Sequence, residues 1–235
     1  MPGEFVEPVP FMQRAVYGGV NQAVAALIPS GATRVLDLGC GDGSFGKWLK
    51  SNGVSSVTGV TVQGTEAELA RRVLDEVIEA DLDRWEPAEE QVFDGIVASH
   101  VLEHLSEPDR LLRVLQARVK PGGWLVAALP NALFWRQRLA FLAGNFRYTQ
   151  GGIMDSTHLR FFDWTTAHAL LTGNGWQPEC AVADGSLPGS RWTGPLRPIL
   201  NRWACRAFPG LFGFQFVFQA RLPTRSPPVS GHQTS

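Results

Sequence analysis

The chain has 235 residues, of which 44% are hydrophobic and 18% charged, and its formal net charge at pH 7 is −1. These totals predict one soluble globular core and exclude a whole-chain field that attracts nucleic acid. Three cysteines, Cys40, Cys180 and Cys205, are too few for a disulfide framework or a zinc cluster. The sequence has no apolar run long enough to span a bilayer, and its first residues lack the apolar region of a secretory signal. We therefore expect a cytoplasmic protein with no nucleic-acid partner and no membrane partner.

Strand-like and helix-like runs alternate along the chain, which is typical of a parallel sheet covered by helices on both faces. Two alternating stretches, 176–184 and 212–222, are expected to add an antiparallel pair near the end. The expected strands before that pair are Arg34–Leu38, 57–62, 76–80, Phe93–Ser99 and 124–129.

Capping boxes mark two expected helix starts, one from Thr65 to Glu68 and one from Ser106 to Asp109. The sequence KPGG at 120–123 is expected to end the second of these helices and to lead into the next strand. Two further helices are expected at 131–143 and 164–171.

The stretch 187–208 is rich in proline, arginine and tryptophan, which is more typical of a cap than of a sheet. The residues 223–235 have low complexity and are expected to be a disordered tail. We therefore expect a single domain over 1–222 with a cap insertion at about 187–208.

The stretch VLDLGCGDGSFG at 35–46 places four glycines directly behind an apolar strand. Such a turn followed by a helix N-terminus presents free backbone N–H groups and lets a ligand approach the main chain. Dinucleotide-binding enzymes also use this arrangement, so the turn alone does not identify the ligand. Asp37, at the end of the strand, would repel a pyrophosphate and favours a ligand that carries an amine or a sulfonium.

Two later stretches, FDGIVASHVLEHLSEPDRLL at 93–112 and KPGGWLVAALPN at 120–131, follow in order. Together the three stretches resemble the ordered motifs of class I S-adenosylmethionine-dependent methyltransferases, and the likeness covers roughly Tyr17 to Leu222. GGIMDSTHLRFFD at 151–163 is similar to a bacterial subgroup related to the methionine-biosynthesis protein MetW and to methyltransferases of glycan and natural-product pathways. The resemblance implies a Rossmann-like α/β fold with a seven-stranded, mostly parallel sheet and a small C-terminal cap insertion.

The resemblance also implies S-adenosyl-L-methionine as the cofactor and S-adenosyl-L-homocysteine as the product. Asp37 matches the carboxylate that faces the amino group of the cofactor. The methionine part of the cofactor would lie against the turn that holds Gly39, Cys40, Gly41 and Gly43.

Further cofactor contacts are implied beyond this turn. Asp81 matches the acidic residue that hydrogen-bonds the adenine amine, and Leu82 lies beside it. Ser99 and His100 fall where the family places residues near the sulfonium and its methyl group. Tyr17 lies in the N-terminal segment that often closes over the cofactor.

One position departs from the family pattern. After VTGV the family usually has Asp or Glu, whose two oxygens accept both ribose hydroxyls, whereas this chain has Thr61, then Val62 and Gln63. Because a bidentate, charge-assisted pair is lost, we expect weak binding of the cofactor or use of a variant of it, unless Gln63 compensates.

Methyl transfer from a sulfonium is an in-line displacement, and an alcohol acceptor also needs a base. His158 follows the helix after the fifth strand, where this fold builds its acceptor site, and it is the first candidate for that base. Asp155 would orient His158 or act as the base itself. In the alternative interpretation, His158 and Arg160 hold a loop against the sheet through hydrogen bonds.

The sequence HVLEH places His100, Glu103 and His104 on one helical face, at the H-x-x-E-H spacing of inverted zinc proteases. It also resembles the E-x-x-E-H metal site of ubiquinone-pathway O-methyltransferases and small-RNA methyltransferases, in which His158 would supply another ligand. The surrounding methyltransferase pattern favours an ordinary helix start, with Glu103 and His104 as caps or pocket walls. We therefore expect no metal.

Aromatic and basic side chains gather in the second half of the chain, and most of the aromatic ones are expected in the core. The arginines there would meet an anionic acceptor or form a solvated face. The residues expected to line the acceptor pocket are His104, Asn131, Trp135, Tyr148, Arg160 and Trp192.

Together these features predict an S-adenosylmethionine-dependent methyltransferase that acts on a small molecule, most simply a hydroxyl of a sugar or secondary metabolite, as a monomer or homodimer. One alternative is a non-catalytic, MetW-like partner protein, in which Thr61 marks decay of the ribose site. Another is an enzyme with this fold that catalyses a non-methyl reaction, such as a cyclisation or a decarboxylation.

Overall fold

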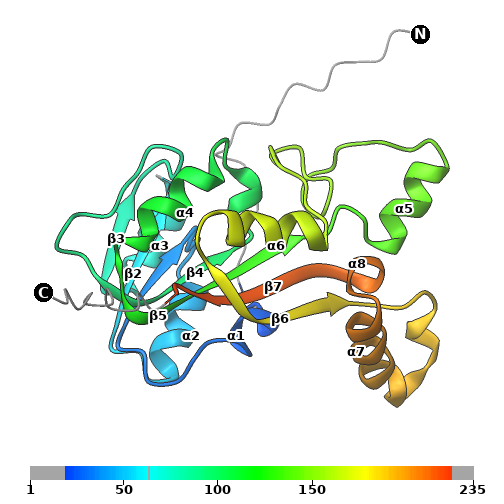
Figure 1. Cartoon of the computed structure of the whole chain (residues 1–235), viewed down its shortest axis with the longest axis horizontal. Coiled ribbons are helices and arrows are strands. Elements are labelled where there is room, and N and C mark those ends of the chain that lie inside the picture. Colours follow the sequence, from blue (N-terminus) through cyan, green and yellow to red (C-terminus); the bar gives the residue numbers. More distant parts are fainter. Residues whose placement is uncertain (1–18, 63, 224–235) are drawn as a thin grey trace, which may run out of the picture.

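The computed structural model describes residues 19–62 and 64–223 of the chain. Its centre is one sheet of seven strands in the order β3-β2-β1-β4-β5-β7-β6 (Figure 1). Strands β1 to β5 pair in parallel, whereas β7 pairs antiparallel with both β5 and β6. This arrangement confirms the expected Rossmann-like α/β fold. The strands are β1 (Arg34–Leu38), β2 (Ser56–Thr61), β3 (Glu76–Glu79), β4 (Phe93–Ser99), β5 (Val119–Pro130), β6 (Gln177–Gly185) and β7 (Gly213–Arg221).

The burial of the first strands explains why the sheet is parallel. The last four residues of β1 and the last five of β2 are buried, with no alternation between the two sides of the strand. Strands that are covered on both faces consist of such continuous apolar runs. Two hydrophobic clusters, one on each face of the sheet, provide the cover.

Helices form both layers (Figure 1). One face packs against Val24, Phe45, Leu49 and Ala70 of α1 (Gln22–Ala25), α2 (Ser44–Ser51) and α3 (Thr65–Ala70). The other face packs against Leu111, Leu112, Leu115 and Leu171 of α4 (Pro108–Gln116) and α6 (Trp164–Gly173).

Beyond one end of β5, β6 and β7 lie further helices, with α5 on one side and α7 and α8 on the other (Figure 1). Trp135 Nε1 donates a hydrogen bond to Ser186 O at 2.7 Å, and Arg138 Nη2 donates one to Gly210 O at 3.2 Å. These bonds join α5 to the segment between β6 and β7. The elements at this end are α5 (Trp135–Leu142), η3 (Ser190–Trp192), η4 (Gly194–Leu196), α7 (Arg197–Ala207) and α8 (Pro209–Phe212).

The two expected capping boxes do not form. Thr65 is already the first residue of α3, after Gly64 at the N-cap, and α4 begins at Pro108, after Glu107. A distant side chain replaces the second box, because Asp83 Oδ1 accepts hydrogen bonds from the backbone N–H groups of Ser106 and Glu107. The described chain does have a capping box at α6, from Asp163 to Thr166.

Two expected helix boundaries are also corrected. α4 ends at Gln116, and β5 already includes the KPGG sequence, so this sequence does not end the helix. The helix expected at 131–143 begins only at Trp135, because Asn131 still bonds to the sheet through its N–H to Phe214 O at 2.9 Å.

Within residues 19–62 and 64–223, no helix combines the length and the apolar character needed to cross a bilayer.

Candidate functional site

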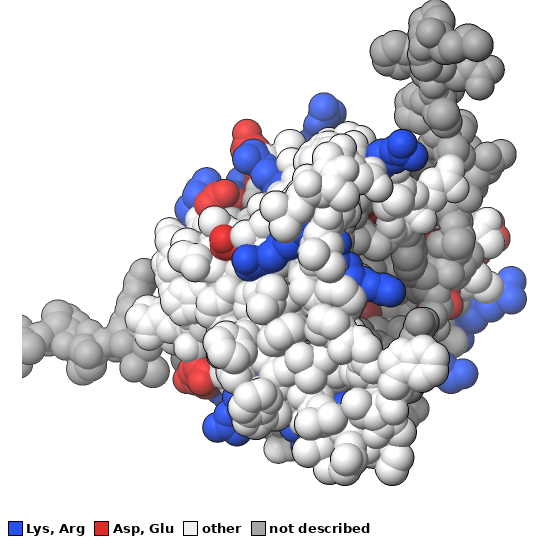
Figure 2. Space-filling model, turned by 90° about the vertical axis from the view of Figure 1, so that its right-hand side faces the viewer, with Lys and Arg blue, Asp and Glu red and all other residues white. Residues whose placement is uncertain are grey.

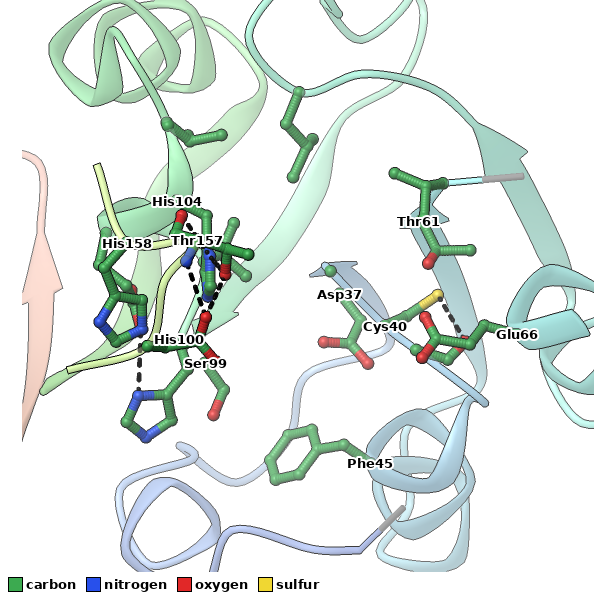
Figure 3. A pocket seen from close by; sticks show the side chains of 18 of the residues that line it. Asp37, Cys40, Phe45, Thr61, Glu66, Ser99, His100, His104, Thr157 and His158 are labelled. Carbon is green, nitrogen blue, oxygen red and sulfur yellow. Dashed lines mark hydrogen bonds and ion pairs between the residues drawn. The ribbon is translucent and has the colours of Figure 1, made fainter. Parts of the chain in front are cut away.

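A cavity of about 830 Å³ lies at the carboxyl ends of β1, β2 and β4 (Figure 3). Pockets for small ligands are usually roughly 300–1,000 Å³, so this one has room for a cofactor and part of a second molecule. Tyr17 and Gln63 lie outside the described residues. The expected cofactor residues that line the cavity are Asp37, Gly39, Cys40, Gly41, Thr61, Val62, Asp81, Leu82, Ser99 and His100.

The turn after β1 needs glycine for two different reasons. Gly39 and Gly41 have φ values of 63° and 53°, in the left-handed region that glycine adopts at low cost. A Cβ on Gly39 would lie 2.6 Å from Cγ2 of Val101, so this position also needs glycine for packing. The backbone of Gly41 lines the cavity.

Gly43 is placed differently from its expected role, because it is not among the described residues that line the cavity. A Cβ at this position would lie 2.7 Å from Cγ2 of Val73 and 3.1 Å from Cα of Ala70. Gly43 therefore allows the start of α2 to pack closely against α3 and the turn that follows it.

Asp37 points into the cavity from the end of β1 (Figure 3). Its side chain is 3% exposed, and Oδ2 is buried without a hydrogen-bond partner among the described residues. Burial raises the pKa of this carboxyl from 3.8 to about 7. A buried carboxylate without a partner is costly, so this position fits a ligand that brings a cationic donor.

Thr61 and Asp81 line the cavity at the ends of β2 and β3. Thr61 is buried, whereas Asp81 is exposed and accepts a hydrogen bond from Asp83 N at 3.0 Å. Glu66 on α3, which sequence reasoning did not place in the site, also lines the cavity.

Figure 3 shows the Glu66 carboxylate next to Cys40, on the side of the cavity that holds Thr61. Burial, followed by the charges of Asp37 and Glu66, raises the pKa of the Cys40 thiol. The signal in the sequence is weak, because Glu66 follows the usual acidic position by five residues and lies in the first turn of a helix.

His104 and His158 lie on the opposite side of the cavity (Figure 3), and with Glu103 they form a cluster of three potential metal ligands. One ligand atom from each of Glu103, His104 and His158 lies within 4.8 Å of the other two. His158 Nδ1 is 3.0 Å from Ile153 O, and His104 Nδ1 is 3.2 Å from Thr157 O. These carbonyls assign the N–H to Nδ1 in both rings, so Nε2 carries the lone pair.

Glu103 is fully buried, and its Oε2 has no hydrogen-bond partner among the described residues. Two imidazoles and a carboxylate form a ligand set used by catalytic zinc sites. The donor set therefore fits a divalent cation, which favours the metal alternative over the expectation of no metal.

His100 does not belong to this ligand set. Its Nδ1 is 3.2 Å from Glu103 Oε1 and its Nε2 is 2.8 Å from Gln215 Oε1. Gln215 Nε2 donates to Asp184 Oδ2, which fixes the amide so that Oε1 faces His100. Side-chain oxygens therefore engage both ring nitrogens of His100, and the ring contributes no ligand atom to the cluster of Glu103, His104 and His158.

Burial lowers the pKa of His100, but the contacts with Glu103 and Gln215 outweigh it, so that the net shift is upward. His100 also has a φ of 57°, the only positive φ of a non-glycine residue in the described ranges. The strained backbone aims the ring back toward Glu103. Ser99, the residue before it, accepts a hydrogen bond from Asn21 Nδ2 at 3.3 Å.

Asp155 shapes the loop that carries His158. Its Oδ1 accepts hydrogen bonds from Thr157 N at 2.8 Å and from Thr157 Oγ1 at 2.6 Å. Its backbone carbonyl accepts one from His158 N at 3.1 Å. Asp155 and His158, the two candidate catalytic residues, both line the cavity, and so does His104.

The other residues expected to contact the acceptor lie outside the described lining of this cavity. Asn131 is buried and donates to Gly213 O at 2.7 Å, and Trp135 donates to Ser186 O, so both hold the chain together. Arg160 donates to Ser106 O, which agrees with the loop-holding interpretation of that residue. Tyr148 and Trp192 are exposed, 57% and 79% respectively.

Residues 11–181 of the sequence match the family described as "Methyltransferase domain", which is more than half of the chain. A ubiquinone biosynthesis O-methyltransferase of Methylobacterium nodulans is 30% identical over 190 residues, which cover 75% of this chain and 69% of that protein. One of Bordetella avium is 32% identical over 105 residues, which cover 42% of this chain and 43% of that protein. The chain thus spans less than half the length of the second relative.

The fold also matches solved structures. An S-adenosylmethionine-dependent methyltransferase from Mesorhizobium loti superposes with a TM-score of 0.60 at 20% identity, covering 85% of this chain and 96% of the other. The site fits that cofactor, because Asp37 Oδ2 lacks a partner among the described residues and the glycine turn lines the cavity beside it. The chain therefore belongs to the S-adenosylmethionine-dependent methyltransferases, and S-adenosylmethionine is its cofactor.

Proposed function

We propose that the protein transfers the methyl group of S-adenosylmethionine to a hydroxyl of a small molecule, with a sugar or secondary metabolite as the acceptor. One observation carries the proposal. The cavity that holds the glycine turn and Asp37 also holds His104 and His158, so a cofactor site and proton-accepting groups share one space. The names of the two relatives support O-methylation as the reaction class.

In this proposal, three acidic residues bind different parts of the cofactor. Asp37 pairs with its ammonium group, Asp81 accepts a hydrogen bond from the adenine amine, and Glu66 accepts from the ribose hydroxyls in place of the acid missing at Thr61. The backbone of Gly41 lies against the methionine part. These contacts direct the methyl group toward the side of the cavity that contains His100 and Ser99.

His158 then takes the proton of the acceptor hydroxyl at Nε2. Ile153 O holds its Nδ1–H, which fixes the tautomer and aims the lone pair. Because the reaction is an in-line displacement, much of the rate comes from holding the hydroxyl oxygen and the methyl carbon in line.

The unpartnered Oε2 of Glu103 favours a second arrangement of the same reaction. In it, Glu103, His104 and His158 hold a divalent cation, and His158 is a ligand rather than a base. When bound, such a cation lowers the pKa of a coordinated hydroxyl. His100 Nδ1, 3.2 Å from Glu103 Oε1, helps to hold the Glu103 side chain in place.

Calorimetric titration with S-adenosylhomocysteine tests the proposal against a non-catalytic partner protein. We expect saturable binding by the purified chain, followed by release of S-adenosylhomocysteine when S-adenosylmethionine is incubated with a panel of sugar and phenolic hydroxyl acceptors. Absence of binding by a folded protein would support the partner interpretation. Binding without methylated product, but with a rearranged acceptor, would support a non-methyl reaction.

A further inference from the structure

An apolar surface lies at the end of the molecule that α5 and α7 form. All twelve large hydrophobic side chains that are exposed in the described ranges lie between Leu139 and Phe214. Several are largely exposed, including Leu142 at 84% and Trp192 at 79%. Exposed apolar side chains that gather on one surface mark an interaction site, whereas single ones need no explanation. We call this surface the aromatic end, and it consists of Leu139, Leu142, Phe146, Tyr148, Trp192, Leu196, Ile199, Trp203 and Phe208.

The outward face of α7 shows how this surface is built. Ile199, Arg202, Trp203 and Arg206 are all exposed and follow the i, i+3, i+4, i+7 spacing that places residues on one side of a helix. The inward side packs Ala204 and Cys205 against the domain. The helix therefore turns a tryptophan, an isoleucine and two arginines away from the protein.

The charges of this end all have one sign. Between 186 and 212 the chain has Arg191, Arg197, Arg202 and Arg206 and no Asp or Glu. Between 131 and 154, around α5, the chain has Arg136, Arg138 and Arg147 and again no acidic residue. The next acidic residue along the chain is Asp155. Figure 2 shows this side as a mostly uncoloured surface with several blue basic side chains across it.

The two segments are linked at this end of the molecule. The bonds from Trp135 to Ser186 and from Arg138 to Gly210 tie α5 to the segment between β6 and β7. The guanidinium groups of Arg197, Arg202 and Arg206 form no ion pair with any residue of the described chain, which leaves their charge unbalanced.

This chemistry distinguishes between the possible occupants. A symmetric contact with a second copy would bring the same patch against itself, and arginines would face arginines with no acidic partner. An anionic bilayer surface supplies both missing elements, because tryptophan and aliphatic side chains enter the headgroup region while arginines pair with phosphates.

We propose that the aromatic end docks on the surface of a bilayer that contains anionic lipid. Trp192, Ile199 and Trp203 enter the interface, and Arg202 and Arg206 bind headgroup phosphates. This binding is peripheral, since no described helix can cross the bilayer, and it is an alternative to the expectation that the protein has no membrane partner. The inference concerns binding alone and does not depend on the proposed reaction.

Sedimentation with vesicles tests the proposal on the full chain. We expect the protein to pellet with vesicles of phosphatidylcholine mixed with phosphatidylglycerol, to remain in solution with phosphatidylcholine alone, and to be released at high salt. Arg202→Gln and Arg206→Gln should each weaken binding roughly fivefold, since each basic residue near an anionic surface contributes by about that factor. A Trp192→Ser, Trp203→Ser double variant should lose most of the binding.

Matched controls come from another part of the molecule. Arg72 and Arg84 are also exposed, so Arg72→Gln and Arg84→Gln remove the same charge from the other end of the sheet and should leave binding unchanged. All substituted side chains are exposed, so melting temperatures should stay close to that of the wild type. Equal effects of the control arginines would overturn the proposal in favour of non-specific charge attraction.

Two other results would also overturn it. If the folded wild-type monomer does not pellet with the mixed vesicles, the aromatic end is not a membrane-binding surface. A protein that ignores both vesicles but forms a dimer, which the tryptophan double variant abolishes, uses the aromatic end to bind a second copy.

Discussion

The imidazole rings of His104 and His158 meet edge to face, with 4.7 Å between their centroids and 72° between their planes. A backbone carbonyl holds Nδ1 of each ring, so the two side chains reach the cavity in fixed orientations. Residues more than fifty positions apart in the chain thus form one unit, and most of the predictions about chemistry concern it.

Replacing His158 with glutamine should lower kcat by about 10²–10⁴-fold, because a general base or a ligand is lost, while the affinity for S-adenosylhomocysteine stays the same. His168→Gln is the matched control, since His168 is exposed on α6 and lies outside the cavity. Steady-state kinetics and calorimetry on both variants check this. A fully active His158→Gln enzyme would move the assignment to Asp155.

Metal analysis separates the two roles of His158. If the cluster holds a cation, the purified protein should retain about one equivalent of zinc or another divalent ion after dialysis, and Glu103→Gln should lose it. Glu107→Gln, at an exposed position four residues later, should retain it. Chelation should remove activity and added ion should restore it. A metal-free wild type with unchanged activity would assign His158 as a base.

The affinity for S-adenosylhomocysteine should depend on pH through Asp37. Burial raises its pKa to about 7, so below that pH the carboxyl is protonated and cannot pair with the ammonium group. Affinity should fall by up to about tenfold for each pH unit below 7. Asp37→Asn should bind weakly at pH 8 and lose this dependence, whereas Asp42→Asn, also in the lining, should keep it.

The same pKa predicts a change in stability. A carboxyl whose pKa is raised in the folded state stabilises the fold below its unfolded-state pKa, and this contribution is lost as pH rises through about 7. Thermal unfolding of the cofactor-free proteins should therefore show Asp37→Asn gaining stability relative to the wild type between pH 5 and pH 8. A constant difference between the two melting temperatures would contradict the raised pKa.

Glu66→Gln should weaken binding of S-adenosylhomocysteine by about tenfold or more, because a charge-assisted hydrogen bond to the ribose is lost. Glu68→Gln is the control, since Glu68 is exposed on the same helix. Thr61→Asp should bring no gain, because a second carboxylate would face Glu66. A large gain in affinity for Thr61→Asp would show instead that the ribose has no acidic partner in the wild type.

Gly41→Val should abolish binding of S-adenosylhomocysteine, because its side chain would occupy the cavity. Gly53→Val is the control, because it also places a side chain on a residue with a positive φ. Gly53 has a φ of 97° and open space around it. Both variants should melt at a lower temperature than the wild type, and only Gly41→Val should lose the ligand. Retained affinity in a folded Gly41→Val protein would show that the ligand lies elsewhere.

The sequence predicts the sheet well because its signals are local. Continuous apolar runs such as Trp124 to Leu129 mark buried strands, and the turn after β1 follows from the glycines themselves. That Asp37, Thr61 and Ser99 line one cavity follows from the sequence for a similar reason, since the ends of parallel strands meet at one edge of the sheet. The helix starts were not, because Asp83, a residue far along the chain, caps α4 in place of Ser106.

The acceptor side depends on tertiary contacts that no local pattern contains. Asn131 and Trp135 are sequence neighbours of the site, but their polar atoms bind the backbone of the segment between β6 and β7. Glu66 enters the cavity only because α3 packs beside the end of β2. His100 leaves the ligand set because Gln215, on a strand more than a hundred residues later, accepts its Nε2–H.

The position of β7 in the sheet determines the order in which the last strands can pair during synthesis. β7 lies between β5 and β6, and within the described chain β6 pairs with no other strand. During synthesis, β6 therefore leaves the ribosome before the strand that it pairs with. The edge of β5 also has no partner until β7 (Gly213–Arg221) is made. The groups around Asp37 are complete well before that moment, whereas His100 gains Gln215 only with the final insertion. A nascent chain would thus complete the groups around Asp37 first, and the hydrogen bond between His100 and Gln215 would form last.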